Sequence, residues 1–255
     1  MTALKKGVYV LPNFFTSLSL FCGFYSVVAT MQTRFVHAAW AIVIAAVFDG
    51  LDGRVARLTR TTSRFGVEYD SLADLVAFGI APGVLAYGWQ LDSCGRLGWL
   101  AAFLYVACGA IRLARFNVQA GPSATRYFLG LPIPAAAGMI AGTVIFCMHV
   151  GIVEHALIPP LLVAVLYGMA FLMVSTIHFK SFKEFDLHAR KPFNTVVGAI
   201  LIICVFASEP QFMLFAAALG YVVSGPVGYV RYLVRRHRRK EQPLVHAEEN
   251  HEHKD

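Results

Sequence analysis

The sequence contains little charge. Of its 255 residues, 15% are charged and 57% are hydrophobic, whereas soluble domains carry about 25% charge and roughly 45–50% apolar residues. No polar segment is long enough to form a separate soluble domain, and no internal repeat is evident. These absences exclude an ordinary soluble domain and a repeat array, and they indicate one integral membrane domain.

Cysteine pairs and familiar nucleophile arrangements are also missing. The five cysteines are scattered singly without a CxxC pair, which argues against a disulfide framework or a cysteine-ligated metal site. No Ser-His-Asp or Cys-His arrangement stands out, so covalent nucleophilic catalysis is not indicated. Three histidines in the final "HAEENHEHKD" could hold a metal, but a solvated end is the favoured interpretation.

Long apolar stretches are what the sequence does contain. A bilayer core is crossed by about 20 helical residues, and the pattern predicts an all-α, polytopic membrane helix bundle with about eight transmembrane helices. The first stretch could instead be a cleaved signal peptide, but its length and the internal Pro12, Asn13 and Thr16 favour a span. The eight stretches are Val8–Met31, Ala38–Leu58, Val67–Trp89, Leu97–Arg115, Leu131–Val150, Leu157–Ile177, Phe193–Ala207 and Gln211–Val234.

Positive charge lies mainly on one side of these predicted spans. With Lys5 and Lys6 placed in the cytoplasm, only Arg34 and Arg96 among the 22 lysines and arginines fall on the opposite side. Cytoplasmic loops retain positive charge. The sequence therefore predicts that both termini are cytoplasmic.

The net charge of +7 does not indicate nucleic-acid binding. Its densest run, residues 235–240, directly follows the last predicted span. Such a cluster either contacts the anionic inner leaflet or only fixes the topology. We predict a membrane domain at residues 1–234 and a cytoplasmic tail at residues 235–255, first basic and then of mixed charge. This tail is predicted to be disordered because it is charged and has no apolar periodicity.

Four aspartates interrupt the apolar sequence within the second and third stretches. Asp49 and Asp52 are three residues apart, and Asp70 and Asp74 are four apart, so each pair shares one helix face. The short connection at residues 58–65 makes the two helices antiparallel neighbours. Carboxylates in a partly dry site repel one another. We therefore predict that they bind divalent cations, as in two-metal phosphoryl-transfer sites.

Residues next to the aspartates suit the same chemistry. Gly53 and Gly66 allow a ligand to approach the backbone closely, and Ala56 is small. Alternatively, the glycines only let helices pack, and the arginines only mark the inner membrane side. The groups suited to binding phosphate are Arg57, Arg60, Arg64 and Ser63.

The complete pattern resembles the signature of the CDP-alcohol phosphotransferase family. It reads Asp49-x2-Asp52-Gly53-x2-Ala56-Arg57-x8-Gly66-x3-Asp70-x3-Asp74. The resemblance implies that a CDP-linked alcohol binds with two divalent cations, Mg²⁺ or Mn²⁺. A phosphoalcohol would then pass to an acceptor hydroxyl, and CMP would be released.

The resemblance also implies roles for individual residues. Asp49, Asp52, Asp70 and Asp74 would bind metal, and Asp74 would also be the catalytic general base. Asn13 and Thr16, in the "PNFFT" of the first stretch, would line the nucleotide site, although such residues often bond only within or between helices. The implied CDP-binding set is Asn13, Thr16, Asp49, Gly53, Ala56, Arg57, Ser63 and Gly66.

Four longer segments, the first of which overlaps the signature, resemble bacterial integral-membrane members of the family whose substrates are CDP-diacylglycerol and L-serine. The segments are "SRFGVEYDSLADLVAFGIAPG", "CGAIRLARFN", "GLPIPAAAG" and "MVSTIHFKSFKEF". This resemblance implies a homodimer in the bacterial inner membrane, among membrane lipid, with the active site facing the cytoplasm. Arg112 and Arg115 share a helix face and could bind the serine carboxylate or the donor diphosphate. Alternatively, they only mark the inner side.

Three other functions are compatible with parts of the pattern. A relative could use glycerol 3-phosphate, inositol phosphate or choline as acceptor with the same chemistry. A cation transporter could use intramembrane aspartates, although the neighbouring arginines would repel a travelling cation. A catalytically inactive scaffold would tolerate replacement of all four aspartates.

Overall fold

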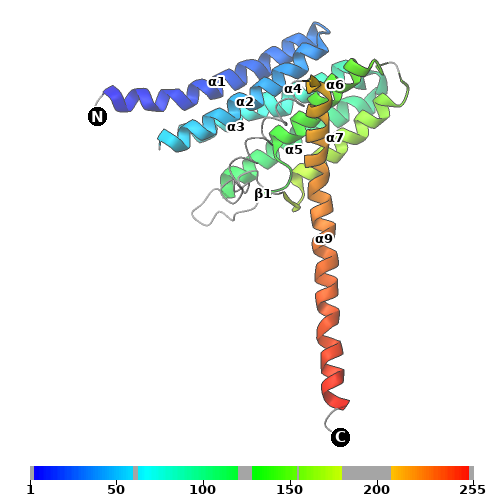
Figure 1. The fold of residues 1–255 in the computed structure, drawn as a ribbon. Helices are drawn as coiled ribbons and strands as arrows, with labels where there is room; N and C mark the ends of the chain where they lie inside the picture. Colours follow the sequence, from blue (N-terminus) through cyan, green and yellow to red (C-terminus); the bar gives the residue numbers. More distant parts are fainter. Residues whose placement is uncertain (1–2, 60–62, 120–127, 154, 180–207, 253–255) are drawn as a thin grey trace.

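The computed structural model describes residues 3–59, 63–119, 128–153, 155–179 and 208–252 as an α-helical bundle with one very short strand pair (Figure 1). This confirms the all-α class. The order is α1 (Ala3–Met31), α2 (Phe35–Thr59), α3 (Arg64–Asp74), π-helix η1 (Leu75–Ile80), α4 (Ala81–Trp89), 3₁₀ helix η2 (Leu91–Cys94), α5 (Arg96–Gln119), β1 (Phe128–Leu129), α6 (Ile133–Val150), α7 (Ile158–Val174), β2 (His178–Phe179) and α9 (Pro210–Glu252).

Six segments in the described part of the chain are long and apolar enough to cross a membrane. They are Pro12–Met31, Phe35–Ala56, Arg64–Trp89, Arg96–Val118, Ile133–Val150 and Pro210–Arg231. The sequence predicts eight spans. The predicted span Leu157–Ile177 corresponds to α7, an apolar helix of 17 residues that ends at Val174. The predicted span Phe193–Ala207 lies outside the described residues.

Small residues bring the first helices close together. Gly23 of α1 lies directly against Ala77 of η1, where any side chain on Gly23 would overlap the Ala77 backbone. On α2, Ala38 and Ala45 are fully buried. Helices in membranes associate through such small residues, because lipid offers no hydrophobic driving force. This packing holds α1 against both α2 and the α3–η1 segment.

The π-helix η1 follows Asp74 directly and is anchored in the core. Its Phe78 is fully buried, and the Phe78 carbonyl accepts a hydrogen bond of 2.8 Å from the hydroxyl of Tyr105 on α5. A polar bond inside an apolar bundle satisfies groups that would otherwise be costly to bury. The bond therefore fixes α5 beside the end of α3.

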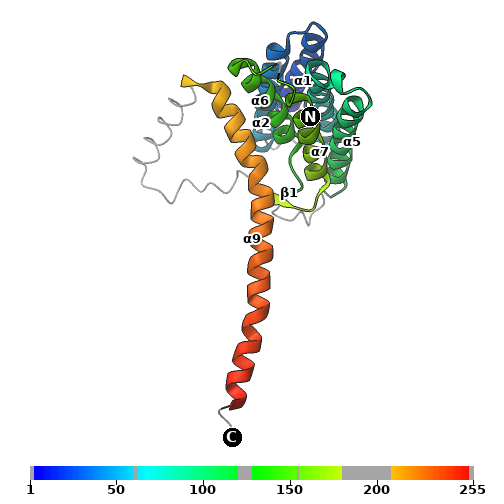
Figure 2. The ribbon, with the colours of Figure 1, turned by 90° about the vertical axis from the view of Figure 1, so that its right-hand side faces the viewer.

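Helix α9 packs on the far side of the bundle and extends well beyond it (Figures 1 and 2). Phe146 of α6 stacks on Phe215 of α9 with ring centroids 4.7 Å apart. Strands β1 and β2 pair antiparallel, with Phe128 opposite Phe179, and the Phe179 ring fills the space beside Gly225 of α9. The strand pair therefore links the lower end of the bundle to α9.

The tail differs from its sequence-based prediction. Residues 235–252, predicted to be disordered, continue α9 as a helix to Glu252. Arginine, lysine, glutamate, glutamine and alanine have high helix propensity, and a helix that already exists can be extended at little cost. Charge and missing apolar periodicity therefore do not separate disorder from a solvated helical extension.

Candidate active site

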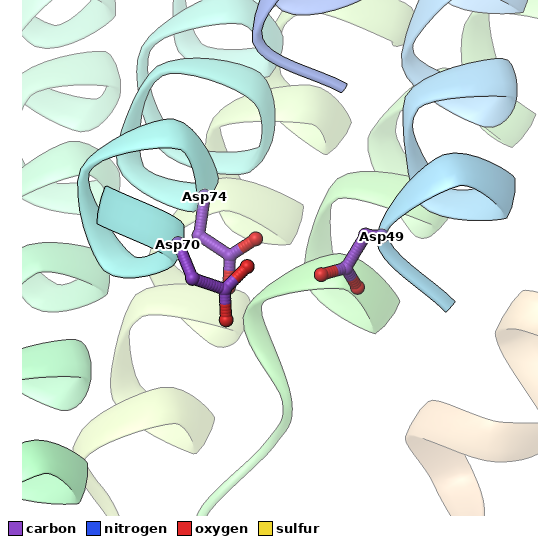
Figure 3. A group of neighbouring side chains, drawn as sticks. All are labelled: Asp49, Asp70 and Asp74. Atoms are coloured by element: carbon purple, nitrogen blue, oxygen red, sulfur yellow. The ribbon is translucent and has the colours of Figure 1, made fainter. Parts of the chain in front are cut away.

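Three carboxylates converge from two helices. Asp49 comes from α2, and Asp70 and Asp74 come from α3 one helical turn apart. One carboxylate oxygen of each residue lies within 4.8 Å of the others, and all three side chains are half-buried. Figure 3 shows Asp70 and Asp74 side by side with Asp49 facing them. The spacing of four residues and the antiparallel course of α2 and α3 produce this arrangement.

Asp52 lies beside this trio and is turned toward α1. Its side chain is 5% exposed and accepts a hydrogen bond of 2.9 Å from the Thr16 hydroxyl. Three residues correspond to about 300° of helix rotation, so Asp52 is displaced around α2 from Asp49. Asp52 still interacts electrostatically with Asp49 and Asp70. The four acids thus form one charged region, with three in a tight group and the fourth bonded to α1.

The beginning of α3 meets α1 next to the acids. Ser63 is the N-cap of α3, and its hydroxyl accepts a hydrogen bond of 2.9 Å from the Gly66 backbone N–H. A Cβ atom added at Gly66 would lie 3.1 Å from Ser63 Oγ and 3.5 Å from Asn13 Oδ1. The structure therefore brings Asn13, Ser63 and Gly66 together. Ser63 already has a structural task here, since N-caps satisfy free N–H groups of a helix.

Two further contacts link α3 to its neighbours. Ser17 of α1 and Tyr69 of α3 share a hydrogen bond of 2.8 Å between their hydroxyls. On the other side, the Asn117 side-chain amide of α5 donates to Ser71 Oγ at 2.9 Å. These bonds hold α3 between α1 and α5 and so fix the positions of Asp70 and Asp74 relative to both helices.

The other predicted nucleotide-site residues lie on the same part of α2. Gly53 and Ala56 are half-buried within one turn of Asp52. The side chain of Arg57 and all of Arg60 lie outside the described residues. Contacts across helices are present for Thr16, which bonds to Asp52, and for Asn13, which lies beside Gly66.

Arg112 and Arg115 both lie on α5 and are half-buried. Neither forms an ion pair with the aspartates in the described part of the chain. Arg112 is within electrostatic range of Asp74, and its Nε has no hydrogen-bond partner among the described residues.

Sequence reasoning missed the bond between Ser17 and Tyr69, which holds α3 against α1 directly beside Asp70. The two residues are 52 positions apart, so no local spacing connects them.

The residues of the trio fit a divalent metal ion. Magnesium and manganese prefer carboxylate oxygens, and three such groups meet here without an ion pair to lysine or arginine among the described residues. Like charges at this separation in a membrane-embedded site repel strongly. A bound cation would offset this repulsion. Packing alone does not explain why three carboxylates are placed together inside the bundle.

Comparison with known proteins identifies relatives of the chain. The family model described as "CDP-alcohol phosphatidyltransferase" matches residues 9–159. A protein of Helicobacter pylori named "CDP-diacylglycerol--serine O-phosphatidyltransferase" is 43% identical over 180 residues, which cover 69% of this chain and 74% of the relative. A protein of Methanocaldococcus jannaschii with the same name is 31% identical over 231 residues, covering 91% of this chain and 99% of the relative.

Proposed function

The chain belongs to the CDP-alcohol phosphatidyltransferase family, and on this basis we propose that it transfers the phosphatidyl group of CDP-diacylglycerol to L-serine. The products are phosphatidylserine and CMP. The observation that carries the proposal is the convergence of Asp49, Asp70 and Asp74 in a chain whose relatives are named for this reaction.

In the proposed mechanism Asp74 is the general base. It lies at the end of α3 beside η1, and it takes the proton from the serine hydroxyl. The serine oxygen then forms a bond to the phosphorus that carries diacylglycerol. The bond from this phosphorus to the bridging diphosphate oxygen breaks, and CMP leaves with the electron pair.

The acidic residues have a second task in this proposal. Asp49, Asp52, Asp70 and Asp74 would hold two divalent cations, Mg²⁺ or Mn²⁺, which neutralise the negative charge of the donor diphosphate. The Thr16 hydroxyl orients Asp52 through their hydrogen bond. The Ser17–Tyr69 bond keeps α3 in register with α1. Catalysis is thus positioning and electrostatics rather than covalent chemistry.

We place the nucleotide at the junction of α1, α2 and α3. A Cβ atom added at Gly66 would crowd Ser63 Oγ at 3.1 Å and would meet Asn13 Oδ1 at an ordinary contact distance of 3.5 Å. Gly53 and Ala56 provide similar small surfaces on α2. The proposed CDP-binding set is Asn13, Thr16, Asp49, Gly53, Ala56, Arg57, Ser63 and Gly66.

The acceptor lies on the opposite side of Asp74. Arg112 is the proposed ligand of the serine carboxylate, because it lies within electrostatic range of Asp74 and its Nε is an unused donor among the described groups. Arg115 is on the same helix three residues later and is assigned a weaker supporting role. In this proposal the hydroxyl of the bound amino acid reaches Asp74.

The proposal includes a membrane arrangement. We propose eight spans within a domain at residues 1–234, cytoplasmic termini, a cytoplasmic tail at residues 235–255, and a homodimer in the bacterial inner membrane with its active site facing the cytoplasm. The support is the distribution of lysine and arginine and the family resemblance. Cysteine labelling from each side of the membrane and light scattering of the purified protein measure topology and oligomeric state.

A substrate survey tests the proposed reaction. The full chain in phospholipid nanodiscs is given CDP-diacylglycerol and Mg²⁺ with serine, glycerol 3-phosphate, inositol phosphate or choline, and CMP is measured. We expect CMP release that depends on serine. CMP release only with another acceptor would support the transfer reaction but contradict serine as the acceptor. No CMP release with any acceptor would contradict the enzymatic proposal.

A further inference from the structure

A single π turn separates α3, which carries two of the acids, from α4. Asp74 ends α3, and η1 begins at the next residue. At the end of η1 the Ala81 N–H donates to the Val76 carbonyl, a step of five residues instead of the four of an α-helix. Single π turns within α-helices are frequent at functional sites. This turn lies directly beside the proposed base.

Pro82 explains why a regular α-helix does not continue through η1. It is the second residue of α4 and follows Phe78 by four positions. Proline has no backbone N–H, and its ring clashes with the carbonyl four residues earlier, so the Phe78 carbonyl lacks the donor that an α-helix would supply. The Tyr105 hydroxyl of α5 donates to this carbonyl at 2.8 Å, and both residues are fully buried. Tyr105 thus supplies the donor that Pro82 cannot.

Helix α5 holds the chain on both sides of Asp74. Three residues before Asp74, Ser71 accepts the hydrogen bond of 2.9 Å from the Asn117 amide, which is partly buried. Four residues after Asp74, Phe78 accepts the fully buried bond from Tyr105. Removing the donor from a fully buried carbonyl is costly, because no water can replace it. The Tyr105 bond is therefore the more costly of the two to lose.

The π turn determines which face of α3 meets α2. A turn closed over five residues has the effect of one inserted residue, which corresponds to about 100° of α-helix rotation. In α4, six of nine residues are buried, whereas Ala73 is the only buried residue of α3. The core therefore fixes α4. Loss of the π turn would rotate α3 and move Asp70 and Asp74 away from Asp49, which they face in the structure (Figure 3).

We propose that Tyr105 is a positioning residue for the acids of α3. Its bond to the Phe78 carbonyl maintains the π turn, and the π turn keeps Asp70 and Asp74 directed at Asp49. The inference rests on the proposed function, because it links Tyr105 to the cations and the reaction that these acids serve. Tyr105 acts through the backbone of η1 and contacts neither the substrates nor the cations.

Tyr105→Phe tests this role, because it keeps the buried ring and removes only the hydroxyl. We expect kcat for CMP release to fall about 10²-fold, as for a small misplacement of reacting groups, with the KM for serine nearly unchanged. Mn²⁺ affinity, measured by electron paramagnetic resonance without substrates, should weaken about 10- to 100-fold, as for the loss of a residue that orients metal ligands. Tyr87→Phe, which removes a bond from the other end of α4 to Asp92, is the control and should match the wild type.

Adding Pro82→Ala to Tyr105→Phe separates positioning from stability. The double variant has an N–H at position 82 that can bond to the Phe78 carbonyl in a regular α-helix. It should therefore melt at a higher temperature than Tyr105→Phe and should fold even where the single variant does not.

The regular helix lacks the π turn, so kcat and Mn²⁺ affinity of the double variant should stay low. Recovery of both together with the melting temperature, or wild-type values of both in Tyr105→Phe, would overturn the inference. A wild type that binds Mn²⁺ but releases no CMP with serine would instead overturn the proposed function.

Discussion

Helices α2 and α3 differ from helices α6 and α7 in what they place inside the bundle. The first pair brings three carboxylates to within 4.8 Å of one another, whereas the residues buried by α6 and α7 are apolar or glycine. Both pairs run through apolar surroundings, where charge is costly. The contrast teaches that charge is concentrated where α2 and α3 meet, which supports a functional role for these acids.

Metal removal is expected to have the largest effect on the function of the acids on α2 and α3. We expect EDTA to abolish CMP release, because without a cation the carboxylates repel both one another and the donor diphosphate. Restored activity on adding Mg²⁺ or Mn²⁺, measured with the same protein sample, is the expected control. Full activity in EDTA after dialysis against metal-free buffer would contradict the metal requirement.

Loss of the proposed base should be nearly as severe. Asp74→Asn is expected to lower kcat by about 10²–10⁴-fold, the usual contribution of general acid–base catalysis. The protein should remain folded, because the change removes one charge from a repulsive group. CMP release and thermal unfolding of the same preparation measure the two effects. A variant that keeps wild-type kcat would remove Asp74 from the mechanism.

Loss of the hydrogen bond between α1 and α2 should have an intermediate effect on activity. Thr16→Val keeps the shape of the side chain but removes the donor to Asp52. We expect the KM for CDP-diacylglycerol to rise about tenfold while the KM for serine stays constant. Ser17→Ala, which removes the exposed bond to Tyr69, is the neighbouring control, with a smaller expected effect.

The packing of α9 should have the smallest effect. An added methyl at Gly225 overlaps Phe179, whereas Gly228 on the same helix has nothing within 4 Å. Overpacking costs about 1–3 kcal/mol, so Gly225→Ala should lower thermal stability. Gly228→Ala should not change it. Equal behaviour of the two variants would contradict the described fit of α9 against β2.

Local sequence patterns predicted most of the acid site. The spacing of Asp70 and Asp74 placed both on one helix face, and the short connection before α3 placed Asp49 opposite. The same reasoning treated Asp52 as equivalent to Asp49. The structure turns Asp52 toward Thr16, because side chains three positions apart are offset around a helix and α1 fills the space beside the second one.

Long-range contacts were beyond such reasoning. Phe215 of α9 reaches Phe146 of α6 through the packing of these two helices, which no periodicity encodes. The tail illustrates a different limit. Its charged composition predicted disorder, but the same residue types favour helix, and residues 235–252 continue α9. A charged composition indicates that a segment does not join a hydrophobic core, but it does not indicate whether its backbone is helical.

The central claim is that the carboxylates of α2 and α3 bind the cations that hold the donor. Counting bound Mn²⁺ per chain by electron paramagnetic resonance, with CDP-diacylglycerol present, tests it most directly. We predict two bound Mn²⁺ ions in the wild type and fewer in Asp49→Asn and Asp70→Asn. A wild type that binds no Mn²⁺, or variants that bind as many ions as the wild type, would contradict the claim.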